Sequence, residues 1–178
     1  MSALFKNNVK IKIAIPEGLK AWFDSITPIT YKLQALTGSA ELTLLSQQWG
    51  LPSWWDQWVL QLNEPVFTRE IVMRSHGQIY WYARTVISQT CFHADHVFFS
   101  RLTNESIRAL IFDEPRVRLS KRTIYPVNQQ CIEYHWAMKQ KPDLADMVWV
   151  RATEYLFCNQ HPFYLIELIF PELEFVAS

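Results

Sequence analysis

Hydrophobic side chains recur every three or four positions in several stretches of the chain. Only an α-helix brings such positions onto one face, so the pattern predicts helices at residues 17–25, 28–36 and 104–112. Asn104 is the expected N-terminal cap of the last helix, because its side chain can accept a hydrogen bond from a first-turn amide.

Elsewhere the chain carries runs of β-branched and aromatic residues that alternate in part with polar ones, a pattern typical of strands. Two pairs of such runs flank turn-forming sequences, at His76-Gly77 and at residues 158–162, and therefore predict two antiparallel hairpins. The expected strands cover residues 40–46, 66–74, 79–88, 116–124, 131–138, 148–157 and 163–170.

Consecutive hairpins favour one antiparallel sheet with helices packed on it, because no strand–helix–strand alternation is repeated along the chain. A length of 178 residues is typical of one domain, and neither a repeat nor a linker-like tract divides the chain. We therefore expect an α+β fold in which residues 1–178 form a single domain.

The first expected hairpin carries two arginines on strands that are largely apolar. If it closes on a two-residue turn, Arg69 lies directly opposite Arg84 on the apolar face. Facing guanidinium groups repel each other and keep their charge, so an anionic ligand between them would relieve the conflict. Alternatively, each arginine pairs with an internal acid such as Glu70, Glu133 or Glu154, or another turn length shifts the register.

Glu167 stands in the last apolar run, with hydrophobic neighbours on both faces of the expected strand. An unpaired buried carboxylate costs roughly several kcal/mol or keeps its proton. Either state suits a site that moves a proton or binds a ligand hydroxyl. A satisfied ion pair explains the residue equally well.

The charge balance argues against a general nucleic-acid binder, since 17 lysines and arginines offset 17 acidic residues. Charge interrupts every apolar run before it reaches a membrane-spanning length, so we expect no stable membrane insertion. No secretory signal is recognisable at residues 1–12. Together with the unpaired spacing of Cys91, Cys131 and Cys158, this predicts a cytoplasmic protein with reduced thiols.

Two further groups of side chains are weaker candidates for sites. Cys91, His93, Asp95 and His96 are residue types that bind transition metals, but their spacing is poor evidence for a metal centre. The tryptophans at positions 54, 55 and 58 suit a membrane interface in part, but Asp56 interrupts them and no basic face accompanies them. We expect these tryptophans to pack in the core or in a lid.

Several segments follow one another in a recognisable order. They are Ile29-Thr30-Tyr31-Lys32-Leu33, Phe67-Thr68-Arg69-Glu70-Ile71-Val72-Met73, Tyr82-Ala83-Arg84-Thr85-Val86-Ile87, the pair Trp149 and Arg151, and Tyr164-Leu165-Ile166-Glu167-Leu168-Ile169-Phe170-Pro171. In this order they resemble the chorismate–pyruvate lyase family, from about Pro28 to Pro171. The ordered set is more specific than any one segment.

The resemblance implies a sheet-and-helix fold in which helical flaps enclose the ligand. It also implies conversion of chorismate to 4-hydroxybenzoate and pyruvate, the step that feeds ubiquinone biosynthesis, without metal or organic cofactor. The family binds the product carboxylate through an arginine matching Arg69 and main-chain groups matching Ile29 and Arg116, and the ring hydroxyl through a glutamate matching Glu167. Arg69 and Glu167 are therefore the expected catalytic residues, and Arg84 the expected partner of the second chorismate carboxylate.

The chain departs from the family at Ile29, where methionine or leucine is usual, and at Pro115-Arg116-Val117, where a Pro-Leu-Gly-like turn is usual. The second backbone contact could therefore fall on Val117. Our first expectation is a monomeric enzyme that acts on a small molecule. The alternative is a non-catalytic effector-binding domain of bacterial transcription regulators, although only about 27 residues precede Pro28, without a basic recognition helix. A partner-binding protein that uses the tryptophan segment ranks last.

Overall fold

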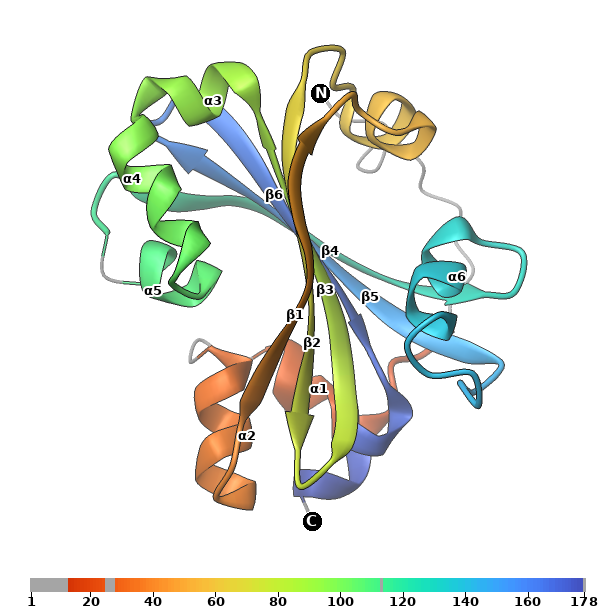
Figure 1. Cartoon of the computed structure of the whole chain (residues 1–178). Helices are drawn as coiled ribbons and strands as arrows, with labels where there is room; N and C mark the ends of the chain where they lie inside the picture. The colour runs from red at the N-terminus through yellow and green to blue at the C-terminus, as the bar shows by residue number, and fades with distance from the viewer. Residues whose placement is uncertain (1–12, 25–27, 113, 178) are drawn as a thin grey trace.

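The centre of the molecule is a six-stranded antiparallel sheet, shown in Figure 1 by a computed structural model that describes residues 13–24, 28–112 and 114–177. The strands are β1 Glu41–Gly50, β2 Val66–Ser75, β3 Gln78–Ser88, β4 Val117–Asn128, β5 Met147–Phe157 and β6 His161–Ile169. Their order in the sheet is β1-β2-β3-β6-β5-β4. Each half is thus a meander of consecutive strands, and the halves join where β3 pairs with β6.

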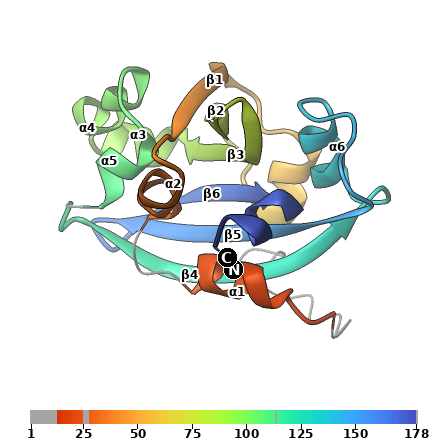
Figure 2. The ribbon, with the colours of Figure 1, turned by 90° about the horizontal axis from the view of Figure 1, so that it is seen from below.

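Short helices cover both faces of this sheet. They are α1 Glu17–Phe23, α2 Ile29–Thr37, η2 Asp56–Leu60, α3 Gln89–Ala94, α4 His96–Ser100, η3 Arg101–Thr103, α5 Ile107–Ile111, α6 Ile132–Met138 and η4 Pro171–Ala177. One face packs against α1, α2 and η4 at one end and against α3 to α5 at the other, while η2 and α6 cover the opposite face. Figures 1 and 2 show this arrangement from two directions.

Most expected elements are confirmed, with shifts of a few residues at their ends. The predicted strand at residues 131–138 is wrong, because this segment forms α6. Tyr134 and Ala137 are its buried residues, and their spacing of three positions is that of one helical face.

The predicted cap of the third helix is also wrong. Helix α5 begins later than expected, and the Ser106 side chain accepts a hydrogen bond from the Ala109 N–H. Ser106 therefore takes the capping role that Asn104 was expected to have. The segment between β3 and η3, for which no helix or strand was expected, is helical and contains α3 and α4.

The β2–β3 hairpin closes on the expected two-residue turn, in which His76 and Gly77 both have a positive φ. Just beyond the turn, a β-bulge leaves Tyr80 without a partner on β2. Because side chains alternate between the two faces, this one extra residue moves every later position of β3 to the other face.

The predicted pairing of the two hairpin arginines is therefore wrong. Arg69 pairs with Thr85, whereas Arg84 pairs with Glu70. The two arginines project from opposite faces of the sheet, and the expected repulsion between them does not arise.

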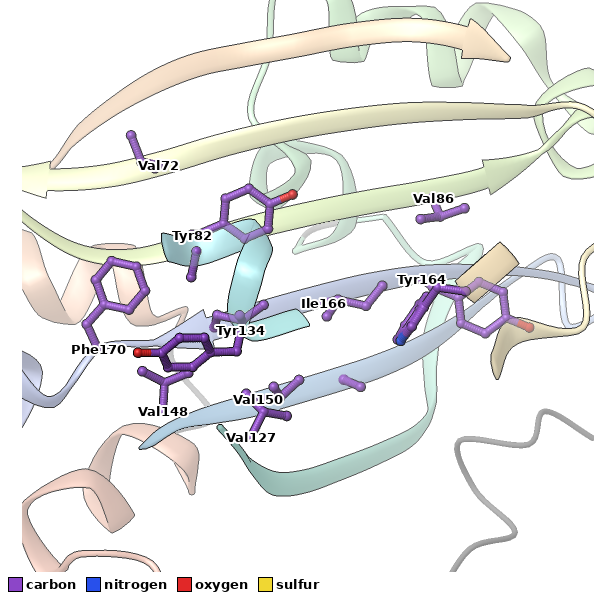
Figure 3. Packing of buried hydrophobic residues seen from close by; sticks show 14 of the residues in the cluster. Val72, Tyr82, Val86, Val127, Tyr134, Val148, Val150, Tyr164, Ile166 and Phe170 are labelled. Carbon is purple, nitrogen blue, oxygen red and sulfur yellow. The ribbon is translucent and has the colours of Figure 1, made fainter. Parts of the chain in front are cut away.

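Arg84 lies in the core that η2 and α6 build on one face, part of which is shown in Figure 3. Its guanidinium forms a bidentate ion pair with Asp56, with N–O distances of 2.5 and 2.8 Å. Asp56 is fully buried and also accepts hydrogen bonds from the N–H and the hydroxyl of Ser53. Burial alone would raise the pKa of Asp56, but Arg84 and Ser53 outweigh it and lower that pKa. The ion pair therefore anchors η2 on the sheet.

We predict that Asp56→Asn destabilises the protein by about 3–5 kcal/mol, because it leaves the buried Arg84 charge with only the longer ion pair to Glu70, at 3.6 Å. Denaturant unfolding at neutral pH measures this loss. Since the pKa of Asp56 is lowered from its usual value of 3.8, its stabilising effect is present above that pH and is lost below it. The difference between parent and variant should accordingly shrink as the pH falls below 3.8.

Asp143→Asn is the matched control, because Asp143 forms its ion pair with Lys141 at the surface, where its side chain is 81% exposed. Removing a surface ion pair changes stability by about 0–1 kcal/mol. Equal losses in the two variants would contradict an anchoring role for Asp56.

Candidate ligand-binding site

Paired residues form two rows across the strands on the face opposite Arg84. One row consists of Arg69, Thr85, Leu165, Thr153 and Arg122. The next row consists of Ile71, Ala83, Glu167, Arg151 and Ile124. Arg69 and Glu167 therefore share a face, on β2 and β6, which are separated by β3 and so lie about 10 Å apart.

A cavity of about 620 Å³ lies over these rows and is bounded by residues of α2 and α5. This volume is typical of small-molecule sites. The charged residues that line it in the described part of the chain are Asp24, Arg69, Arg108, Arg122, Arg151 and Glu167. Arginines outnumber acids by two in this set, and a positive excess favours an anionic ligand.

Arg69 is the cavity residue whose surroundings most strongly indicate a ligand. Arg69 is buried, with 5% of its surface exposed. Its Nε is also buried and has no hydrogen-bond partner among the described residues. Burial lowers the pKa of Arg69, yet an arginine keeps its charge at neutral pH. An unpaired buried charge is costly, and a ligand carboxylate would supply the missing partner.

Glu167 faces the same cavity in an ion pair with Arg151. The Arg151 Nε and Nη2 donate to the two carboxylate oxygens at 2.6 and 2.8 Å, and Nη1 donates to the Trp22 carbonyl at 3.4 Å. Burial alone would lower the pKa of Arg151, but the charge of Glu167 outweighs it and raises that pKa. The ion pair that the sequence left open is thus present, and the carboxylate oxygens still have lone pairs that can accept a ligand hydroxyl.

Two aromatic contacts join α2 to α5 beside the cavity. The Arg108 guanidinium stacks on Tyr31, with its Cζ atom 3.3 Å from the ring centre. Tyr31 also packs edge-on against Phe112 at a centroid distance of 6.3 Å. Figure 2 shows the two helices near each other on one side of the sheet, as the flaps implied by the family resemblance would be.

The structure places Ile29 at the cavity and Arg116 outside its lining. Ile29 is the first residue of α2, where backbone amides lack intrahelical acceptors and favour anions. The Arg116 N–H donates to the Glu114 carboxylate at 3.1 Å, and its carbonyl accepts from Cys158 at 2.7 Å. Val117 does line the cavity, but its N–H donates to the Glu114 carbonyl at 3.0 Å. Both candidate amides thus already have acceptors.

The predicted substrate contact of Arg84 is not supported by its position. The bulge at Tyr80 turns this residue away from the cavity, and Asp56 satisfies its charge. Arg69 and Glu167, by contrast, meet at one cavity as expected.

The Cys91 to His96 segment has structural contacts of its own. Cys91 is buried, and burial raises the pKa of its thiol to about 12. Asp95 caps α4 by accepting from the Phe98 N–H and pairs with Arg116. Within residues 13–24, 28–112 and 114–177, no group of three or more histidines, cysteines and acids is arranged to hold a metal ion.

The tryptophan segment is divided between core and surface. Trp55 is buried and its indole N–H donates to Glu133 at 2.8 Å, which confirms core packing for this residue. Trp54 and Trp58 are instead 63% and 65% exposed. No helix in the described part of the chain is long and apolar enough to cross a membrane.

Three arginines of the cavity, Arg108, Arg122 and Arg151, had no role expected from the sequence. Arg151 stands in a buried strand between apolar neighbours, the same signal that drew attention to Glu167. Arg122 gave no such signal, because a second irregularity leaves Ser120 of β4 unpaired and shifts the register of that strand.

An antiparallel sheet with a cavity beneath short helices on one face is the chorismate lyase-like fold, and the family of this fold binds small molecules. Residues 2–170 match the family described as chorismate lyase, and the chain belongs to this family. No curated protein matches the chain.

Solved structures of bacterial regulators share the fold. The effector domain of PhnF from Mycobacterium smegmatis is 15% identical, with a TM-score of 0.56 over 81% of this chain and 88% of that chain. A GntR-family transcriptional regulator from Enterococcus faecalis V583 is 16% identical, with a TM-score of 0.53 over 74% of this chain and 94% of that chain. At these identities the similarity shows the fold alone.

We predict that Arg69→Met weakens 4-hydroxybenzoate binding at least about tenfold, because a charge-assisted hydrogen bond contributes roughly 1.5–3 kcal/mol. The melting temperature of the ligand-free protein should stay the same or rise, since the variant removes a buried charge that lacks a partner. Titration calorimetry and thermal unfolding measure the two effects.

Arg151→Met is the matched control, because the same substitution there leaves Glu167 without its partner and should lower the melting temperature. The assignment of Arg69 would be refuted by binding within about twofold of the parent.

Proposed function

We propose that this chain is a chorismate–pyruvate lyase, which converts chorismate to 4-hydroxybenzoate and pyruvate and so supplies ubiquinone biosynthesis. The observation that carries the proposal is the pair of complementary groups at one cavity: the unpartnered Arg69 and the Glu167 carboxylate. 4-Hydroxybenzoate carries its carboxylate and its hydroxyl at opposite ends of the ring. A cationic group suits the carboxylate at one end, and a hydrogen-bond acceptor suits the hydroxyl at the other.

The charge of the cavity also supports chorismate, which is a dianion. The described lining has two more arginines than acids, and this excess of positive charge would balance both carboxylates. Arg69 binds the ring carboxylate, helped by the α2 amides at Ile29, while Glu167 accepts the hydrogen bond of the ring hydroxyl.

The reaction requires positioning more than strong chemical activation. The hydrogen on the hydroxyl-bearing ring carbon leaves as a proton, and its electron pair forms the last double bond of the aromatic ring. The neighbouring carbon–oxygen bond breaks, and its electron pair leaves with the enolpyruvyl oxygen. The resulting enolate takes up a proton and becomes pyruvate. Holding the substrate at both ends in a water-poor cavity favours this geometry, and no metal or organic cofactor is required.

A second candidate function is favoured by the fold of the solved neighbours. The PhnF structure is that of an effector domain, and the Enterococcus faecalis structure is that of a transcriptional regulator. A non-catalytic binder of small aromatic acids would use the same Arg69 and Glu167 contacts. Binding therefore does not separate the candidates, whereas turnover of chorismate does.

We predict that the chelator-treated protein, incubated anaerobically with chorismate, releases 4-hydroxybenzoate and pyruvate in equal amounts. Chromatography for the aromatic acid and a coupled assay for pyruvate follow both products. Heat-denatured protein is the control for spontaneous breakdown. Binding of 4-hydroxybenzoate without release of pyruvate would favour the effector-binding alternative, and activity that returns only with added metal would contradict a cofactor-free reaction.

We predict that Glu167→Gln lowers turnover far more than chorismate affinity, because the amide keeps the shape but loses the carboxylate charge. The single variant also leaves Arg151 without a counter-charge and should melt at a lower temperature. The double variant Glu167→Gln/Arg151→Met removes both charges and should recover stability without recovering turnover. Recovery of both would reduce Glu167 to a structural role.

A further inference from the structure

Arg122 is a cavity arginine that the proposed contacts leave unused. It lies on β4 opposite Thr153, in the same row as Arg69 but at the other edge of the sheet. Its side chain is exposed and lines the cavity. Among the described residues it forms no ion pair with an acid, in contrast to Arg84, Arg116 and Arg151.

Arg122 and Arg69 lie on opposite sides of Glu167 along the sheet. Glu167 is on β6, and the sheet continues from there through Arg151 on β5 to β4, away from Arg69 on β2. Arg122 is therefore in the part of the cavity that lies on the far side of Glu167 from Arg69. Any ligand group that extends from the hydroxyl end of the ring toward β4 approaches this guanidinium.

Tyr155 interacts electrostatically with Glu167, Arg151 and Arg122. Burial raises the pKa of Tyr155 and Glu167 adds to the increase, while Arg151 and Arg122 oppose it. The phenol thus remains neutral at physiological pH, and its side chain is hydrogen-bonded to that of Arg122. Tyr155 and Arg122 both line the cavity, so an anion there would find a cation and a hydroxyl donor together.

Chorismate has a group with the required chemistry in the required place. Its ether-linked enolpyruvyl carboxylate is attached to the ring carbon next to the hydroxyl-bearing one, and the ring carboxylate is opposite the hydroxyl. If Arg69 binds the ring carboxylate and Glu167 the hydroxyl, the second carboxylate extends from the Glu167 end.

We propose that Arg122 binds this second, ether-linked carboxylate and is the specificity-determining residue that distinguishes the dianionic substrate from the monoanionic product. The proposal rests on the proposed function for the orientation of the ligand. It assigns to β4 the role that the sequence had suggested for Arg84. It also gives product release a physical basis, because the aromatic product no longer has the group that Arg122 holds.

Arg108 is the competing candidate, because it is also a cavity arginine that forms no ion pair with an acid among the described residues. Its guanidinium is stacked on Tyr31 at 3.3 Å and so belongs to the contact between α2 and α5. The stacking places Arg108 between these two helices, whereas Arg122 lies on β4, two strands beyond Glu167 on β6.

The test compares two unreactive ligands that differ in the second carboxylate. They are 4-hydroxybenzoate and 3-(carboxymethoxy)-4-hydroxybenzoate, which adds an ether-linked carboxylate next to the hydroxyl. Titration calorimetry on the parent and on Arg122→Gln should show that the variant loses at least about tenfold in affinity for the dianion, as expected for a charge-assisted hydrogen bond. Its affinity for 4-hydroxybenzoate should stay within about twofold of the parent.

Arg118→Gln is the matched control, since Arg118 is an exposed arginine of the same strand that does not line the cavity. It removes an equal charge and should change neither affinity. Arg108→Gln tests the competing arginine, and equal melting temperatures of parent and Arg122→Gln verify that the fold is intact.

The inference is overturned if Arg122→Gln weakens both ligands equally, if it weakens neither, if the parent does not bind the dianion, or if Arg108→Gln abolishes the preference instead. A chorismate assay on the same proteins separates this result from the proposed function. A parent that releases no pyruvate refutes the lyase, while the ligand pair still decides the role of Arg122. In an active parent, Arg122→Gln should raise the KM for chorismate without changing inhibition by 4-hydroxybenzoate.

Discussion

The need of buried arginines for counter-charges organises this structure. Arg69, Arg84 and Arg151 are each 5–7% exposed within the described part of the chain, and an arginine does not discharge at any pH that a folded protein meets. Asp56 satisfies Arg84, and Glu167 satisfies Arg151. Arg69 has no such partner among the residues that the structure describes. The two ion pairs hold the sheet and its helices in place, and the remaining charge faces the cavity.

The sheet separates these tasks by face. The face that bears Arg84 is packed by η2 and α6 into a closed core, while the other face is covered only at its two ends. The cavity lies between those ends. Because the strands extend through both environments, packing on the closed face holds the cavity residues rigidly, although the helices over the cavity are short. A site built on strands keeps its geometry when the covering helices separate to admit a ligand.

Much of this architecture is predictable from residue patterns, and the exceptions have identifiable causes. The hairpins, the first two helices and the meeting of Arg69 with Glu167 follow from periodicity and family resemblance. The α6 segment was predicted as a strand, because seven residues are too few to distinguish the hydrophobic period of a helix from that of a strand. Of the two acidic partners of Arg84, Glu70 at 3.6 Å is one that the sequence offered. Asp56, which forms the bidentate pair, was not predictable, since it is distant in sequence and reaches the sheet only through tertiary packing.

The unpaired Tyr80 has a wider consequence. Its presence decides which hairpin arginine faces the cavity, although Tyr80 itself does not line it. The chemistry of the cavity is thus encoded in the length of the hairpin as much as in the identity of its side chains. Among homologous chains, gain or loss of one residue at this point would exchange interior and exterior arginines without any substitution. Comparisons that align these hairpins letter by letter, without regard to the bulge, would then equate residues that lie on opposite sides of the sheet.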